Sequence, residues 1–139
     1  MRYIVLFAAS LTSSLFADAV AQEVRSVTKV YYYDWMATSI VPLSRERLRE
    51  EAFHTLTIEN GPLERRLLEL LDSIEFSDEM SDPRYMNGRL LVEIDVETER
   101  QRTYFANRTR ICRLENQVCA KIDVAFRADI HDLVTSTID

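Results

Sequence analysis

Apolar residues recur every three or four positions in two long segments, which is the spacing of one helix face. The first segment begins at Pro62, which suits the first position of a helix, and its stripe comprises Leu63, Leu67, Leu70, Leu71 and Ile74. The second follows Asp123, a suitable N-cap, and its stripe comprises Phe126, Ile130, Leu133 and Val134. We therefore predict two amphipathic helices that bury these stripes.

A shorter helix is predicted over residues 45–54. Ser44 suits its N-cap, and Leu43 and Leu48 stand at the two positions that pack together in a hydrophobic staple. Leu48 is expected to face inward, whereas the charged side chains of the helix form a solvated face. Residues 56–58 fit either a short strand or the frayed end of this helix.

Residues 24–36 are dense in β-branched and aromatic side chains, which predicts a strand. Alternation places Val30 and Tyr32 on one face and four residues on the other: Val27, Tyr31, Tyr33 and Trp35. Because both faces carry large apolar side chains, we expect both to be covered and the strand to lie inside the sheet.

Residues 89–97 alternate apolar with acidic side chains, and residues 102–106 are expected to return beside them as the partner of a hairpin. Glu93, Asp95 and Glu97 share one face of the first strand. One face of an antiparallel sheet can be solvated, so we expect this face to be polar and wet.

The predicted order is strand, helix, helix, hairpin, hairpin, helix. It indicates an α+β domain in which an antiparallel sheet of about four strands packs one face against two or three helices, with one short disulfide hairpin. The chain contains only 2 glycines and 3 prolines, which argues against disorder and against a turn-rich β-sandwich. Residues 22–139 are long enough for one domain with one core.

Residues 1–21 have the pattern of a secretory signal peptide. Arg2 gives a positive start, residues 3–9 are apolar, and residues 19–21 (Ala-Val-Ala) form a cleavage site before Gln22. A retained membrane anchor is the alternative, but it requires about 20 strongly apolar residues, and serine and threonine interrupt this run. We expect a periplasmic or secreted protein with no membrane insertion after cleavage.

The net charge of the chain is −6. It stays −6 after removal of residues 1–21, which carry one Arg and one Asp. Domains that bind nucleic acid usually show a basic footprint, so we expect no nucleic-acid partner.

Cys112 and Cys119 are the only cysteines in the chain. If residues 110–113 and 118–121 pair as a hairpin, the two cysteines face each other with Cα atoms about 4.5 Å apart, within disulfide range. A disulfide suits an exported protein, whereas two cysteines alone do not make a zinc site. We predict a Cys112–Cys119 disulfide.

Catalytic motifs are sparse. The chain lacks a nucleophile elbow, a zinc-protease helix motif and a glycine loop for phosphate. His54 suits the end of a helix, where it can cap carbonyl groups. His131 cannot point the same way as both Asp129 and Asp132 on one helix, so a solvated face explains it better than a metal site.

The acidic strand face raises the alternative of paired catalytic carboxylates. Glu93 and Asp95 would lie roughly 7 Å apart, a separation comparable with those of the paired carboxylates of glycosidases. Arg100 and Arg102 are expected across the hairpin, where opposite charges stabilise it. We therefore interpret the carboxylates as structural ion pairs and assign no catalytic residue, metal or cofactor.

Two sets of residues suit recognition of a protein partner. The first belongs to the aromatic run and comprises Tyr31, Tyr33 and Trp35. The second belongs to the acidic segment 75–87 and comprises Asp78, Glu79, Asp82 and Tyr85. Tyrosine and tryptophan anchor interfaces, and acidic side chains favour a basic partner; core packing and a solvated loop are the respective alternatives.

Export, small size, acidity and sparse catalytic motifs together favour a non-enzymatic binding protein. We expect an inhibitor or immunity-type partner of an envelope enzyme or toxin. The alternatives are a small exported hydrolase-like enzyme that uses carboxylates and a structural component of the envelope. Asn107-Arg108-Thr109 is a glycosylation sequon, which matters only in a eukaryotic host, whereas the compact signal favours a bacterium.

Overall fold

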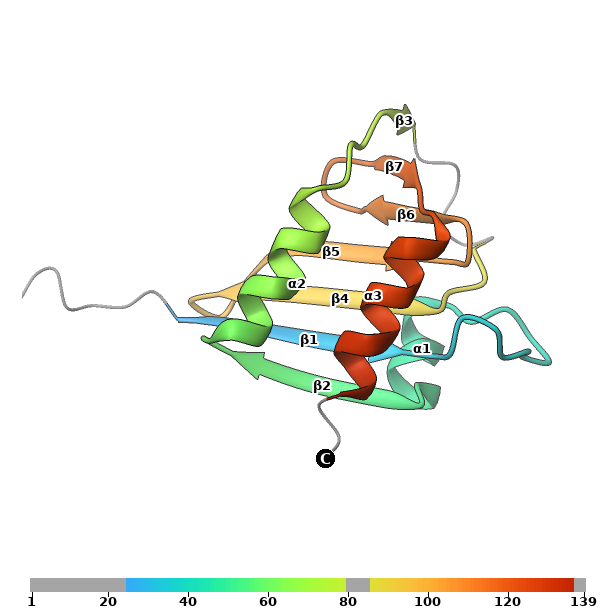
Figure 1. The fold of residues 1–139 in the computed structure, drawn as a ribbon, viewed down its shortest axis with the longest axis horizontal. Coiled ribbons are helices and arrows are strands. Elements are labelled where there is room, and N and C mark those ends of the chain that lie inside the picture. The colour runs from blue at the N-terminus through green and yellow to red at the C-terminus, as the bar shows by residue number, and fades with distance from the viewer. Residues whose placement is uncertain (1–24, 80–85, 137–139) are drawn as a thin grey trace, which may run out of the picture.

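A computed structural model describes residues 25–79 and 86–136 of the chain. Its described strands are β1 (Ser26–Tyr32), β2 (His54–Glu59), β3 (Asp78–Glu79), β4 (Leu90–Val96), β5 (Glu99–Ala106), β6 (Arg110–Arg113) and β7 (Val118–Lys121). They form one sheet in the order β2-β1-β4-β5-β6-β7-β3, in which all neighbours are antiparallel (Figure 1). The α+β class is confirmed, but the sheet has seven strands instead of about four.

The underestimate arises at the two edges of the sheet. β2 follows α1 after only two residues, so its pattern merged with the expected end of the helix. β3 is two exposed residues long and pairs with β7 through Asp78 and Cys119. Neither edge strand carries the long apolar alternation by which β1 and β4 were predicted.

The three helices of the described chain are α1 (Arg45–Glu51), α2 (Pro62–Asp72) and α3 (Val124–Thr135). α2 and α3 cover one face of the sheet (Figure 1) and bury the main core, which includes Leu67, Leu133 and Val92. α1 belongs to a second apolar cluster on the other face. The expectation that all helices cover one face was therefore wrong.

The capping predictions for the helices are confirmed. The Ser44 side chain accepts a hydrogen bond from the backbone N–H of Arg47, and that of Asp123 accepts one from Phe126. Leu43 and Leu48 are both buried in the second cluster, as a hydrophobic staple requires. Each of these signals joins residues no more than five positions apart, which is why the sequence reveals it.

α1 ends at Glu51, earlier than expected. His54 therefore begins β2 instead of capping a helix, and its ring stacks on Tyr32 with the centroids 6.0 Å apart. β1 is interior as predicted, between β2 and β4, but it stops at Tyr32. Beyond this point the alternation fails, because Trp35 returns to the helix-covered core instead of sharing a face with Tyr31.

The cysteine hairpin has the predicted register. Cys112 lies opposite Cys119, Arg113 lies opposite Val118, and the two Cα atoms of the disulfide are 4.0 Å apart. The disulfide is buried in the second apolar cluster, beside Met86. The disulfide therefore lies within the apolar core on the α1 side of the sheet and not at the surface.

Gly88 allows a close approach between β5 and the segment before β4. A Cβ atom at this position would overlap the Phe105 ring. The backbone N–H of Gly88 donates to Leu43, and that of Arg89 donates to Ala106. These contacts hold the start of β4 against the loop before α1.

Within the described ranges no helix combines the length and the apolar character needed to cross a membrane. The predicted signal peptide, residues 1–21, lies outside the described residues, as does its cleavage site before Gln22.

Candidate functional site

The loop of residues 33–44, between β1 and α1, is the centre of the candidate site. Five large apolar side chains are exposed in the described chain, and all of them lie in or beside this loop: Met36, Ile40, Val41, Phe53 and Val124. We call these five residues the apolar rim. Met36 is 76% exposed and Ile40 fully exposed, so the loop offers to solvent the side-chain types that proteins normally bury.

Two cavities lie along the apolar rim. One has a volume of about 490 Å³ and is bordered by Met36 and Val124 together with Trp35. The other has a volume of about 400 Å³ and is bordered by Ile40, Val41 and Phe53 among others. The exposed apolar side chains therefore border hollows that can receive side chains of another molecule.

A third cavity, of about 350 Å³, opens beside the same loop and is lined by polar and charged residues. We call it the polar pocket. It lies where the loop meets the start of β4 and the turn between β5 and β6. Its lining residues are Thr38, Ser39, Asn87, Arg89, Asn107, Arg108 and Thr109.

Two arginines supply the charge of the polar pocket. Arg89 donates from Nη1 to Asn87 Oδ1 (2.8 Å) and to the Gly88 carbonyl, and from Nη2 to the Ala37 carbonyl (3.0 Å). Arg108 donates to the same Ala37 carbonyl from Nη2 (2.8 Å) and to the Trp35 carbonyl from Nε. Both guanidiniums thus hold the backbone of loop 33–44 in place.

Neither of these arginines has a carboxylate partner in the described chain. Arg89 is only 2% exposed, and its Nε has no hydrogen-bond partner. Burial lowers the pKa of Arg89 and the positive charge of Arg108 lowers it further, whereas Tyr33 opposes the shift. Arginine remains protonated at neutral pH, so the pocket holds two positive charges that no carboxylate of the described residues pairs with.

The two asparagines of the pocket use their oxygen atoms within the protein. Asn87 Oδ1 accepts from the backbone N–H of Leu43 (3.0 Å) and from Arg89. Asn107 Oδ1 accepts from the backbone N–H groups of Thr109 and Arg110, which closes the turn between β5 and β6. Since backbone N–H groups can only donate, these bonds assign the oxygens and leave the amide NH₂ groups as the free ends.

Tyr33 links the polar pocket to the apolar rim. Its ring stacks on Phe53 with the centroids 4.2 Å apart, and the Arg89 guanidinium carbon lies 5.3 Å from the ring centroid. Its hydroxyl donates to the Thr38 carbonyl (3.2 Å). This predicted interface residue therefore lies within the candidate site.

The other predicted interface residues do not join it as one surface. Tyr31 is half-buried against the second apolar cluster, and Trp35 is buried, with its indole N–H donating to the Arg127 carbonyl (3.0 Å). Asp78 and Glu79 are exposed on β3, separated from β1 by β4, β5, β6 and β7. Asp82 and Tyr85 lie outside the described residues.

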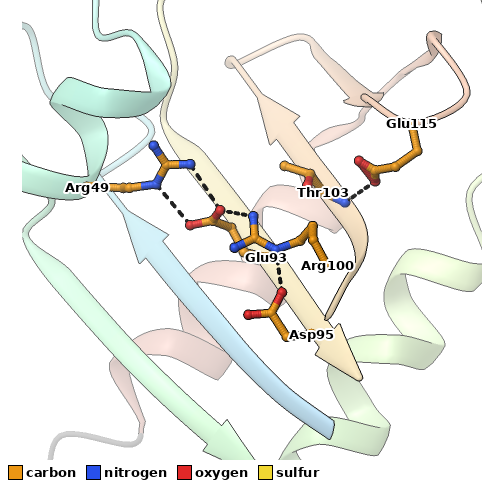
Figure 2. A network of polar contacts seen from close by, with 6 residues as sticks. All are labelled: Arg49, Glu93, Asp95, Arg100, Thr103 and Glu115. Atoms are coloured by element: carbon orange, nitrogen blue, oxygen red, sulfur yellow. Dashed lines mark hydrogen bonds and ion pairs between the residues drawn. The ribbon is translucent and has the colours of Figure 1, made fainter. Parts of the chain in front are cut away.

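The acidic strand face forms a closed ion-pair network (Figure 2). Arg49 of α1 binds both oxygens of Glu93, each at 3.0 Å, and Arg100 of β5 binds Glu93 and Asp95. Beside it, the backbone N–H of Thr103 donates to the Glu115 carboxylate. We call Arg49, Glu93, Asp95 and Arg100 the Glu93 network.

The Glu93 side chain is only 3% exposed, so the expectation of a wet face was wrong at this position. Burial alone would raise the pKa of Glu93, but hydrogen bonds and charges from Arg49 and Arg100 outweigh it and bring the pKa below its usual value. An ionised carboxylate held by two arginines suits structural pairing and not proton donation at neutral pH. Of the two predicted partners, Arg102 instead binds Asp72 of α2 at 2.9 Å.

His131 contributes to packing between α3 and β1. Its Nδ1 lies 2.9 Å from the Tyr32 hydroxyl. Burial raises the pKa of Tyr32 to about 12, with the Trp35 backbone opposing and Asp34 adding to the shift. In the part of the chain that the structure describes, no group of three or more His, Cys, Asp or Glu residues is placed to hold a metal ion.

The sequence interpretation missed Arg89 and Arg108, although a signal for them exists. The pairing of Leu90 with Ala106 brings residue 89 beside residues 107 and 108. Both segments, Asn87-Gly88-Arg89 and Asn107-Arg108-Thr109, combine an asparagine turn with an arginine. The register of the hairpin thus predicts two neighbouring arginines at one end of the sheet.

The chain matches no family model, no curated protein and no solved structure.

Proposed function

We propose that this protein is a small exported binding protein without a catalytic role, which docks a protein partner through loop 33–44. The apolar rim carries the proposal: the described chain gathers its exposed large apolar side chains around one loop. Exposed apolar groups that cluster beside hollows are typical of interaction sites. Within this class we favour an inhibitor or immunity-type partner of an exported enzyme or toxin.

The loop is organised well enough to act as a rigid anchor. Arg89 and Arg108 hold its Ala37 carbonyl, Tyr33 holds the Thr38 carbonyl, and Asn87 Oδ1 accepts from the Leu43 N–H at the end of the loop. A loop that is ordered before binding loses less conformational entropy on association. This organisation supports docking without large rearrangement.

The hydrolase alternative has weaker support from the geometry. Glu93 and Asp95 are both engaged by Arg100, and Arg49 also occupies Glu93. Asp129 is exposed on α3, whereas His131 Nδ1 contacts Tyr32. Asp129 and His131 border two different cavities, so they do not form an acid–base pair within one site as general acid–base catalysis requires.

The docking proposal is tested with Ile40→Glu, because Ile40 is fully exposed and its substitution leaves the core untouched. Thr57→Glu is the matched control: it adds the same charge to an exposed position on β2. A partner captured from the envelope or the medium by the wild-type protein is identified, purified and titrated by calorimetry. We expect Ile40→Glu to weaken binding at least about tenfold and Thr57→Glu to leave it unchanged.

Equal affinity of Ile40→Glu and the wild-type protein for that partner would overturn the proposed surface. Self-association of the wild-type protein in sizing experiments, with no other protein bound, would instead favour a structural envelope component. Export is tested separately by the mass of the protein recovered from outside the cytoplasm. A chain beginning at Gln22 is expected, and a chain that retains residues 1–21 would contradict it.

A further inference from the structure

We infer that the polar pocket binds a carboxylate, and that the partner protein supplies it from an acidic side chain or its C-terminus. The source of the carboxylate rests on the proposed function, whereas the affinity of the pocket for an oxyanion rests on its own residues. In this role the polar pocket, which adjoins the apolar rim, sets the specificity of docking.

The guanidinium and amide groups of the pocket that remain free are hydrogen-bond donors. Arg108 Nη1 makes no hydrogen bond within the described chain, and Arg89 Nη2 uses one of its two hydrogens. The oxygens of Asn87 and Asn107 accept hydrogen bonds, whereas their amide NH₂ groups donate none within the described residues. Carboxylates only accept hydrogen bonds, and they accept them from guanidiniums in a bidentate manner.

The charge of the pocket leads to the same ligand. Its lining contains two arginines and no acidic residue, so a metal ion or an ammonium group would be repelled. Arg89 is almost fully buried without a counter-ion in the described chain. Buried charges are normally paired, and a carboxylate of the partner would supply the missing charge.

The pocket is large enough to admit an acidic side chain or a C-terminus of a partner. Its volume of about 350 Å³ is at the lower end of the range for small-molecule sites. The net charge of −6 disfavours free anions at long range. A carboxylate carried by a docked partner overcomes this disadvantage through its high effective concentration.

NMR titration of the protein with sodium acetate tests the pocket directly, with sodium chloride at equal ionic strength as the reference and inorganic phosphate as a second arm. We expect acetate to shift the side-chain signals of Arg89, Arg108 and Asn107 saturably, with a millimolar dissociation constant. Saturation by phosphate alone would overturn the carboxylate assignment in favour of a phosphate ligand. Shifts no larger than those with chloride would overturn the site altogether.

Arg108→Gln should weaken acetate binding about tenfold, as expected for loss of charge-assisted hydrogen bonds. Arg66→Gln removes the same charge from an exposed position of α2 and should leave it unchanged. Arg108→Lys keeps the positive charge but lacks the planar guanidinium group, so it should weaken acetate binding by a smaller factor. It replaces Arg108→Gln in this test if Arg108→Gln does not fold. Equal acetate affinity of the folded Arg108 variants and the wild-type protein would contradict the inference.

The two proposals fail differently in a titration with the purified partner. If Ile40→Glu abolishes partner binding and Arg108→Gln does not change it, the docking surface holds and the carboxylate inference is wrong. If acetate binds the pocket but neither substitution changes the affinity for the partner, the proposed docking surface is wrong. The partner is then not the source of the carboxylate, and only the affinity of the pocket for an oxyanion is supported.

Discussion

Arg49 and Arg100 flank the middle of β4, whereas Arg89 and Arg108 lie at its beginning. The two pairs of arginines differ in whether carboxylates bind them. The first pair encloses the buried Glu93 and also binds Asp95. The second pair binds backbone carbonyls and the Asn87 amide, with no carboxylate among its described partners. The same residue type thus forms a closed network in one place and an open site in the other.

The difference shows how a structural use of arginine can be separated from a binding use. In the Glu93 network, two guanidiniums compensate a carboxylate whose side chain is inaccessible to solvent, so little capacity remains for a ligand. In the polar pocket, each guanidinium donates hydrogen bonds to backbone carbonyl groups. These groups are neutral, so they do not cancel the positive charge of the arginine. Uncompensated buried charge costs stability, which makes the pocket the better candidate for function.

Glu93→Gln should produce the largest loss of stability. It keeps the shape of the side chain but leaves Arg49 and Arg100 without their shared carboxylate. We expect a loss of about 2–3 kcal/mol in the free energy of unfolding, below the range for fully buried pairs because both arginines reach solvent. Chemical denaturation measures it, and a loss below about 0.5 kcal/mol would show that the network is not closed as described.

The stability lost in Glu93→Gln should depend on pH. The pKa of Glu93 in the folded protein lies below its usual 4.5, so the stabilisation by the ionised carboxylate is fully present above that value. It is lost as the pH falls through the folded pKa. The difference in unfolding free energy between the wild-type protein and Glu93→Gln should therefore shrink below pH 4.5. A difference that stays constant down to the folded pKa would contradict the stabilising role of the ionised Glu93.

Arg108→Gln should destabilise the protein less than Glu93→Gln. It removes hydrogen bonds to the Trp35 and Ala37 carbonyls, but it also relieves the repulsion of Arg89. We expect a net loss of about 1 kcal/mol in the free energy of unfolding. A loss as large as that of Glu93→Gln would indicate that the polar pocket is primarily a structural feature.

Arg47→Ala should have the smallest effect and calibrates the comparison. Arg47 and Glu51 form an exposed pair one turn apart on α1, 3.4 Å between nitrogen and oxygen. Pairs of this kind contribute about 0.3–0.5 kcal/mol. The same denaturation measurement should show a change near this value, and a loss above about 1 kcal/mol would mean that exposure does not separate the two classes of arginine.

Local signals in the sequence determined the elements that depend on neighbouring residues. The caps at Ser44 and Asp123, the stripe after Pro62 and the cysteine hairpin all involve residues within a few positions of each other. Their geometry follows from helix and strand periodicity, so it needs no knowledge of the rest of the fold. The edge strands β2 and β3 lack such signals, which explains why the sheet was underestimated.

Candidate site residues were harder to predict because most are brought together from distant parts of the chain. Tyr33 was identified by its residue type, but its neighbours Phe53 and Arg89 come from other elements. Trp35 was predicted on the wrong face because β1 ends at Tyr32, three residues before it. The importance of Arg89 and Arg108 depends on having no carboxylate partner among the described residues, which no local pattern can reveal.

The sequence by itself determined the α+β class, the helix starts and the disulfide, because these follow from residue spacing and short-range hydrogen bonds. Only the tertiary structure decided which charges are paired. Glu93 is 44 residues from Arg49 and 7 from Arg100, yet it binds both. Arg89 and Arg108 lie close to each other and hold the same carbonyl. Electrostatic energy depends on distance and burial in space, so the chemical character of the site appears only when the chain is folded.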